Sequence, residues 1–275
     1  MAKRSLVSAK VPPSSISYDS ILLKHDAPVS RAFLLLHGLT ASPLQFAEFG
    51  RVLHLRGANV YIPRLPHHGL SDRLTTELKD LTAQELRSFA LQSAAFAQTL
   101  GPRLTVVGFS LGGLLAAFIA QNVPVERATC IAPFLGVAWL PGRMTGRAAR
   151  MVLMLPNRFM WWDPVLRERL MPEHGYPRFA THAVAHAASL ARELMHDAEL
   201  RAPAARDVQI VLNQSETTVN NRAVRKLAAL WSARKGGIVL HRLKGLPLSH
   251  DIIEPLHASG LAPHVYPALL DLVDR

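Results

Sequence analysis

The sequence predicts an α/β protein with a mostly parallel central sheet and helices on both faces. Short apolar or β-branched runs alternate with longer helical patterns along most of the 275 residues. Several of these runs are almost wholly apolar, as expected of strands that are covered on both sides. The predicted strands are 17–23, 32–36, 58–62, 104–108, 127–132, 208–212 and 238–243.

Helix boundaries are indicated by capping and stop signals. Gly57 follows the first helical pattern at the usual position of a C-terminal stop. Thr82 with Glu85 three residues later matches a capping box that opens the second. The predicted helices are 43–56, 82–100, 111–122, 219–235 and 262–273.

The alternation stops between Gly136 and Pro203, a stretch that looks helical and shows no clear strand. We interpret 136–203 as a cap inserted over the carboxyl edge of the sheet, with a tail at 1–15 and a core made of 16–135 and 204–275. The cap holds every methionine except the initiator and three of the four tryptophans. These side chains either fill the cap's own core or line a pliable apolar pocket. The candidates for substrate contact are Trp139, Met144, Met151, Met154, Trp161 and Trp162.

Composition and charge exclude several classes of protein. The net charge of +11 is scattered, without a block of five or six like charges, so we expect no nucleic-acid partner. No apolar run approaches the roughly 18 residues of a membrane span, and the N-terminus lacks the apolar stretch of a signal peptide. The single cysteine, Cys130, lies in an apolar run and reads as a buried, inert thiol. We therefore expect a cytoplasmic protein without stable membrane insertion.

A candidate nucleophile lies in Gly108-Phe109-Ser110-Leu111-Gly112, a G-x-S-x-G pattern. By chance such a match occurs roughly once in ten chains of this size. Here it directly follows a predicted strand and directly precedes a predicted helix, the setting in which a strained turn projects the serine from the sheet edge. Ser110 is therefore the predicted nucleophile.

A serine hydroxyl needs a base, usually a histidine, and the base needs an acid that orients it. In chains with a serine elbow the acid comes next along the sequence and the histidine comes last. His250 comes soon after the last predicted strand, whereas His241 lies within it. Glu216 is the only carboxylate between the preceding strand and the next helix. The predicted triad is therefore Ser110, Glu216 and His250. His182 and His186 share a helix face but lack the rest of a metal motif, so we expect no metal site.

Four motifs resemble the monoacylglycerol lipase and carboxylesterase branch of the α/β-hydrolases. They are 36–43 (LHGLTASP), 65–71 (LPHHGLS), the serine elbow and 249–251 (SHD), and the resemblance runs from about Ser30 to the C-terminus. It implies the α/β-hydrolase fold, no cofactor, and an oxyanion hole made by the backbone amides of Leu39 and Leu111. Two positions depart from the branch: 213–216 (NQSE) replaces Gly-x-x-Asp, and Pro-His-His-Gly replaces Pro-Gly-His-Gly, with His68 in a structural role.

The predicted activity is that of a serine hydrolase that cleaves a carboxylic ester of a small, largely apolar molecule through an acyl-enzyme. Hydrolysis of a carbon–carbon bond, thioester cleavage and acyl transfer use the same fold and triad, so they remain alternatives. A catalytically silent binding module is a further alternative, against which stands the filling of all three triad positions.

Overall fold

The computed structural model describes residues 18–257 and 259–274. Its centre is a seven-stranded sheet in the order β1-β3-β2-β4-β5-β8-β9. Only β1 at one edge is antiparallel to its neighbour, and the remaining pairs in the described part are parallel. The strands are β1 (Ile21–Leu23), β2 (Arg31–Leu36), β3 (Asn59–Ile62), β4 (Arg103–Phe109), β5 (Arg127–Ile131), β8 (Asp207–Asn213) and β9 (Ile238–Leu243). The predicted fold class is confirmed, and the first residue of the predicted strand 17–23 lies outside the described residues.

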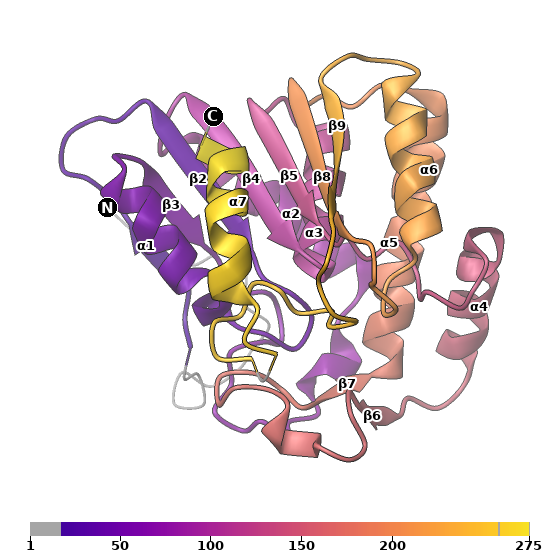
Figure 1. Cartoon of the computed structure of the whole chain (residues 1–275). Coiled ribbons are helices and arrows are strands. Elements are labelled where there is room, and N and C mark those ends of the chain that lie inside the picture. The colour runs from indigo at the N-terminus through magenta and orange to yellow at the C-terminus, as the bar shows by residue number, and fades with distance from the viewer. Residues whose placement is uncertain (1–17, 258, 275) are drawn as a thin grey trace.

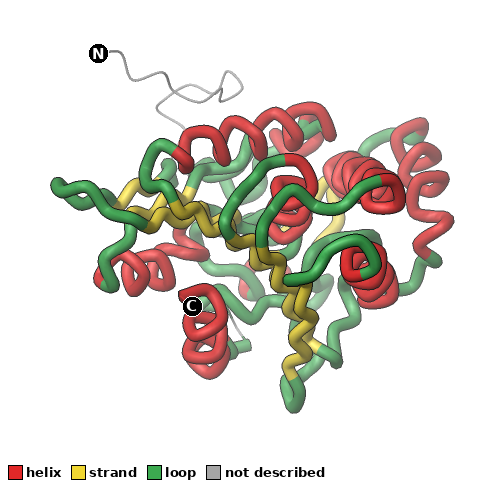
Figure 2. The backbone as a smooth tube through the Cα atoms, turned by 90° about the horizontal axis from the view of Figure 1, so that it is seen from above, coloured by secondary structure: helices red, strands yellow, loops and turns green. Residues whose placement is uncertain are grey.

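Helices cover both faces of the sheet, which runs between them as a twisted band (Figures 1 and 2). Alternate side chains of β2 show the division: Leu34 and Leu36 join one buried cluster, Phe33 and Leu35 the other. One face carries α1 (Ala47–Leu55) and α7 (Ala262–Asp274); the other carries α2 (Ala83–Gln98), α3 (Leu111–Asn122), α5 (Thr181–Leu200) and α6 (Asn221–Ser232).

Local signals account for several of the helix ends. Thr82 and Glu85 form the predicted capping box at the start of α2. Gly57, just beyond α1, has a φ of +83°, which costs glycine little. The predicted helix 43–56 is divided into the 3₁₀ turn η2 (Pro43–Phe46) and α1. A further 3₁₀ turn, η3 (Glu77–Asp80), precedes α2.

The segment 136–203 is not wholly helical, so that expectation was wrong in part. Two short strands, β6 (Phe159–Trp161) and β7 (Arg178–Ala180), pair antiparallel between α4 (Gly142–Met154) and α5, with the 3₁₀ turn η4 (Arg167–Arg169) between them. Each strand is three residues long, too short for a period-two pattern to stand out in the sequence.

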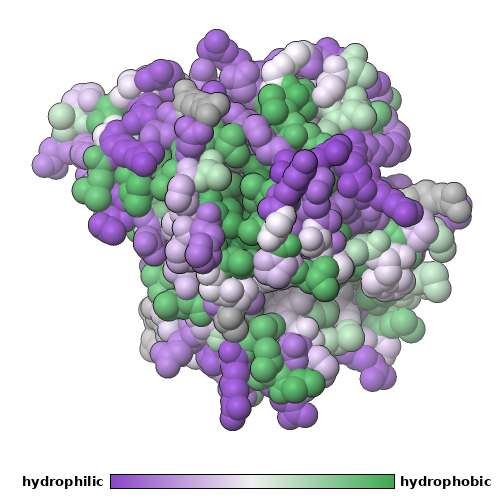
Figure 3. Space-filling model, in the orientation of Figure 1, coloured by the Kyte–Doolittle hydropathy of each residue, from purple (hydrophilic) through white to green (hydrophobic). Residues whose placement is uncertain are grey.

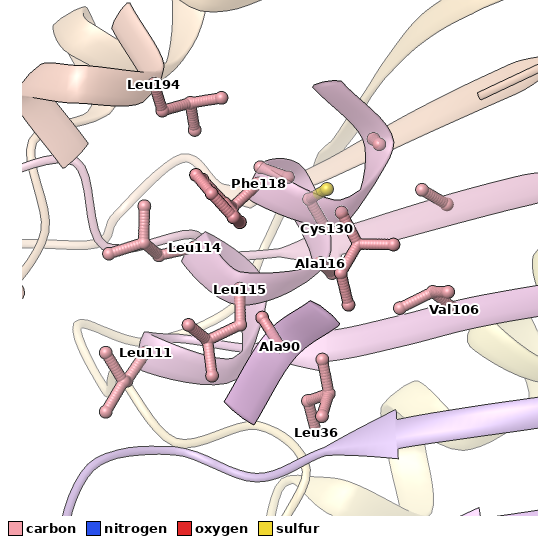
Figure 4. Close-up of a cluster of buried hydrophobic side chains, with 14 of the residues drawn as sticks. Leu36, Ala90, Val106, Leu111, Leu114, Leu115, Ala116, Phe118, Cys130 and Leu194 are labelled. Atoms are coloured by element: carbon pink, nitrogen blue, oxygen red, sulfur yellow. The ribbon is translucent and has the colours of Figure 1, made fainter. Parts of the chain in front are cut away.

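The last helix of this segment is shared with the main core. Leu190, Leu194 and Ala198 of α5 are buried in the cluster beneath the sheet. Figure 4 shows Leu194 beside Phe118 of α3, with Cys130 in the same group of apolar side chains. Burial raises the pKa of the Cys130 thiol, which keeps it protonated and unreactive. The insertion therefore ends as part of the layer that supports β4 and α3.

Candidate active site

Ser110 lies at the sharp turn between β4 and α3, with φ +55° and ψ −113°. Its backbone is fixed from three sides. The N–H donates to the Ile131 carbonyl at 2.9 Å, and the carbonyl accepts from Leu114 at 2.9 Å and Phe134 at 3.0 Å. A non-glycine residue pays for such a backbone conformation with strain, which these bonds offset. The side chain is thereby presented at the sheet edge, and it remains partly exposed.

The glycines around Ser110 allow backbones to approach closely. A Cβ on Gly108 would lie 2.0 Å from the Gly112 carbonyl oxygen. A Cβ on Gly112 would lie 1.9 Å from the Leu36 carbonyl oxygen on the neighbouring strand. Real side-chain carbons do not tolerate either distance, so the elbow needs glycine at both positions.

The three residues assigned from sequence are brought together in one relay. The Nε2 of His250 lies 2.8 Å from the Ser110 Oγ. The Nδ1 of the same ring lies 2.6 Å from the Glu216 Oε2. The ring also packs against Phe109, with 4.9 Å between centroids. In this arrangement Nδ1–H donates to the carboxylate, which leaves Nε2 free to accept the serine proton.

Glu216 is held as a carboxylate by its surroundings. Burial alone would raise the pKa of its side chain, but the hydrogen bond and charge of His250 and two backbone N–H groups hold that pKa below its usual value. Those N–H groups belong to Thr218 and Val219 and donate to Oε1 at 2.6 and 3.4 Å. The acid is therefore ionised and fixed in orientation near neutral pH.

Other nearby acids are engaged elsewhere. Asp251 accepts hydrogen bonds from the Gln45 side chain and from the N–H groups of Ile253 and Glu254. Asp207 lies at the start of β8, 3.8 Å from an arginine of β5. Of the carboxylates in the described part of the chain, Glu216 is the one bonded to His250.

The loop after β2 lies at the carboxyl edge of the sheet and leaves one backbone amide without a hydrogen bond in the described structure. The N–H groups around Leu39 are used within the protein: Gly38 donates to Gln45 Oε1 at 2.8 Å, Thr40 to His68 Nε2 at 3.2 Å, and Ala41 to the Gly38 carbonyl at 3.2 Å. Within the described residues the N–H of Leu39 meets no protein acceptor. Leu111 is the first residue of α3, whose opening N–H groups have no partner in the helix.

Two buried histidines support this loop in neutral form. Burial lowers the pKa of His68 to about 3, and burial with the neighbouring His68 lowers that of His37 well below its usual value. The Nδ1 of His68 donates to the Pro66 carbonyl at 2.7 Å, so that its Nε2 accepts from Thr40. These contacts fit the structural role expected of His68.

The segment between β5 and β8 reaches back to the same loop, a contact that sequence reasoning missed. Thr40 has φ +68°, an uncommon value for a β-branched residue. Its carbonyl accepts from the N–H of Tyr176 at 2.7 Å, and its Oγ1 accepts from the indole N–H of Trp162 at 2.8 Å. Trp162, a candidate for substrate contact, therefore fixes the residue next to Leu39.

A second Ser-His-Glu set lies close by but has no access to solvent. Ser42 Oγ is 3.0 Å from His174 Nδ1, and His174 Nε2 is 3.3 Å from Glu254 Oε2. Ser42 is fully buried and its Oγ also accepts from the N–H of Leu44. A substrate carbonyl cannot reach it, so this set acts as a further tie between the segment 136–203 and the core.

Most of the other cap candidates point to the surface. The exposed fraction is 81% for Trp139, 67% for Met151 and 80% for Met154, and Met144 is also exposed. They therefore do not fill an interior of the segment 136–203. Figure 3 shows apolar side chains at the surface over α4 and at the lower end of the molecule. Trp161 is half-buried, with the guanidinium of Arg167 over its ring.

The first residue of the NQSE sequence at 213–216, which replaces Gly-x-x-Asp, positions the candidate catalytic loops. Asn213, the last residue of β8, donates through Nδ2 to the carbonyls of Pro247 and Ser249 at 2.9 and 3.1 Å. Its Oδ1 accepts from the N–H of Ser215 at 3.0 Å. It thus joins the loop that carries the acid to the loop that carries the histidine. The signal available in the sequence was an amide at the end of the strand that precedes the acid.

Metal-binding clusters and membrane-spanning helices are absent from the described part of the chain. His182 Nε2 lies 2.8 Å from the carbonyl of Leu155, the residue that follows α4, so it is engaged in a hydrogen bond. In the part that the structure describes, no cluster of three metal-ligating side chains occurs. No helix among those residues is long and apolar enough to span a bilayer.

Comparison with known proteins identifies the family. The model of the alpha/beta hydrolase family matches residues 33–265. The chain belongs to that family. Similar solved structures include one from a study of the metagenome-derived lipolytic enzymes LipS and LipT (TM-score 0.68, 16% identity, 94% of this chain and 98% of that one). Another is the monoacylglycerol lipase of Paleococcus ferrophilus (TM-score 0.68, 17% identity, 92% and 97%). At these identities the likeness shows the fold alone.

A curated relative is closer in sequence over a shorter stretch. Esterase YjfP of Escherichia coli K12 is 30% identical over 104 residues, which is 35% of this chain and 42% of that protein. The match therefore spans less than half of the relative. The family expected from sequence is confirmed.

Proposed function

We propose that this protein is a serine hydrolase that cleaves a carboxylic ester of a largely apolar substrate through an acyl-enzyme. The observation that carries the proposal is the continuous relay from Ser110 through His250 to Glu216, with contacts of 2.8 and 2.6 Å. The relatives described as esterases and lipases support the choice of an ester.

The proposed mechanism follows from the tautomer that Glu216 imposes. His250 Nε2 takes the proton of Ser110 as the oxygen attacks the ester carbonyl. The oxyanion of the tetrahedral intermediate accepts from the amides of Leu39 and Leu111. His250 then protonates the leaving alcohol, and the reverse sequence with water releases the acid.

We propose that the segment 136–203 acts as a cap that selects the substrate. The contacts of Trp162 and Tyr176 with Thr40 support this, because they place cap residues beside the proposed oxyanion loop. Side chains from the cap are then expected to form part of the wall above Ser110.

A fluorophosphonate probe followed by peptide mapping tests the proposal. The probe should label Ser110, and Ser110→Ala should lose ester turnover by several orders of magnitude with its melting temperature preserved. Ser93→Ala is the matched control, since the Ser93 hydroxyl is buried in α2 without a hydrogen-bond partner in the described structure. Labelling at another serine would overturn the assignment. Faster turnover of thioesters, or of carbon–carbon bonds in diketones, than of esters would overturn the reaction class.

A further inference from the structure

A groove separate from the triad lies between α4, α5 and the start of α6. It encloses about 1100 Å³, and the residues that line it include none of the triad. Its apolar lining comes from Leu135, Leu153, Ala191, Met195 and Ala223. A volume of this order accommodates a small organic ligand.

Cationic side chains border the groove in excess of acidic ones. Both glutamates of the lining are already paired: Glu193 with Arg87, and Glu199 with Lys226. That leaves three arginines, one from each helix, that have no carboxylate within ion-pair distance among the described residues: Arg150, Arg192 and Arg222.

One of these arginines is positioned at the expense of helix propensity. Gly146 lies inside α4, where glycine costs about 1 kcal/mol relative to alanine. A Cβ at this position would lie 2.2 Å from the Cδ of Arg192. The absence of a side chain at Gly146 therefore leaves room for the Arg192 side chain to cross α4. There Arg192 lines a second hollow together with Arg147 and Arg150, and this hollow shares lining residues with the first.

The first turn of α4 adds to the positive potential. Pro141 and Gly142 line the groove, and the N-terminus of α4 has no side-chain cap. Unpaired N–H groups at a helix start favour an anion. Apolar walls bordered by guanidinium groups and an uncapped helix start match a ligand with an apolar chain and an anionic head.

We infer that this groove binds a medium-chain aliphatic carboxylate, the kind of acid that the proposed reaction releases. The choice of a carboxylate rests on the proposed function, whereas the groove and its charge do not. Held there, the acid lies outside the triad, so its effect on turnover would be non-competitive with substrate.

Calorimetric titration of decanoate into the full-length Ser110→Ala protein, below the micellar concentration, tests the inference. Binding should be saturable, and at least tenfold weaker for decanol, which lacks the charge, and for acetate, which lacks the chain. Arg192→Gln and Arg150→Gln should each weaken it by about tenfold, since each removes a charge-assisted contact. Gly146→Ala should weaken it as well, although alanine favours the helix.

Arg225→Gln is the matched control, because Arg225 is an exposed arginine of α6 that does not line the groove. Circular dichroism establishes that each variant is folded. Equal loss with Arg225→Gln and Arg192→Gln would overturn the inference, and so would decanol binding as tightly as decanoate. Decyl phosphate binding more tightly than decanoate would overturn the assignment of a carboxylate.

The wild-type protein blocked by a fluorophosphonate separates the two proposals. Undiminished decanoate binding to the blocked protein supports the groove, whereas its loss would place the acid at the nucleophile and overturn the inference. If the probe fails to label Ser110 but Arg192-dependent binding persists, the proposed reaction falls and the groove stands.

Discussion

Substitution of Glu216 by glutamine tests the relay at its most buried point. The glutamate side chain is fully buried, and its Oε1 accepts from the N–H groups of Thr218 and Val219. Glutamine must keep its oxygen toward these donors, which turns its NH₂ toward His250 Nδ1. The imidazole then carries its proton on Nε2, facing the Ser110 oxygen at 2.8 Å, and cannot accept the serine proton.

The expected loss is about 10⁴-fold in kcat, by analogy with the corresponding acid-to-amide change in serine proteases. That loss corresponds to about 5 kcal/mol of transition-state stabilisation. The assay is the steady-state hydrolysis of a p-nitrophenyl ester, with the melting temperature measured in parallel. KM should change little, because the acid does not touch the substrate.

Two further variants test whether the effect depends on the charge of Glu216 and on its contact with His250. Glu216→Asp keeps the charge but shortens the arm by one methylene, so its kcat should fall by less than that of Glu216→Gln. Glu254→Gln removes another buried carboxylate that faces a histidine, His174, and should lower kcat by less than tenfold. A Glu216→Gln enzyme within tenfold of the wild-type kcat would refute the reasoning, as would an effect confined to KM.

Three other predictions follow from the contacts around the site. Trp162→Phe removes the bond to Thr40, worth about 1 kcal/mol, and should lower kcat several-fold while Trp161→Phe does not; equal kinetics of the two variants would count against the contact. Because the pKa of folded His68 is about 3, its contribution to stability is complete above pH 6.5 and is lost as pH falls toward 3. In chemical unfolding His68 should account for about 2 kcal/mol of the stability lost between pH 7.5 and 5, so His68→Asn should reduce that loss by about this amount while the contribution of His37 remains. Catalytic efficiency on aryl esters should rise about fourfold per acyl methylene, from about 0.8 kcal/mol each, until the pocket is full; a flat profile would exclude an apolar acyl pocket.

The core of this fold was accessible from sequence because its signals are local. Strands covered on both faces read as apolar runs, and their predicted bounds differ from the observed ones by a few residues at most within the described part. Ser110 follows from a five-residue motif between a strand and a helix. Glu216 and His250 follow from chain order after their strands, which parallel strands bring to the same edge of the sheet.

The structure of the segment 136–203 was harder to predict because its contacts join residues that are distant in the sequence. The bond between Trp162 and Thr40 spans 122 positions, and no local pattern marks either partner. The sequence shows how many methionines the segment contains but not whether their side chains are buried. Met151 and Met154, for example, are exposed to solvent. The need for glycine at position 146 could not be predicted, because it depends on the Arg192 side chain, which crosses this position from another helix.

The burial of α5 in the main core matters for any exchange of the proposed cap with the corresponding segment of a relative. A chimera cut at 136 and 203 would also remove Leu190, Leu194 and Ala198, and so would open a void beneath α3. A graft that ends at Ala180, where β7 gives way to α5, would leave this packing whole. The proposed substrate-selecting part, 136–180, could then be exchanged while the helix that completes the core stays in place.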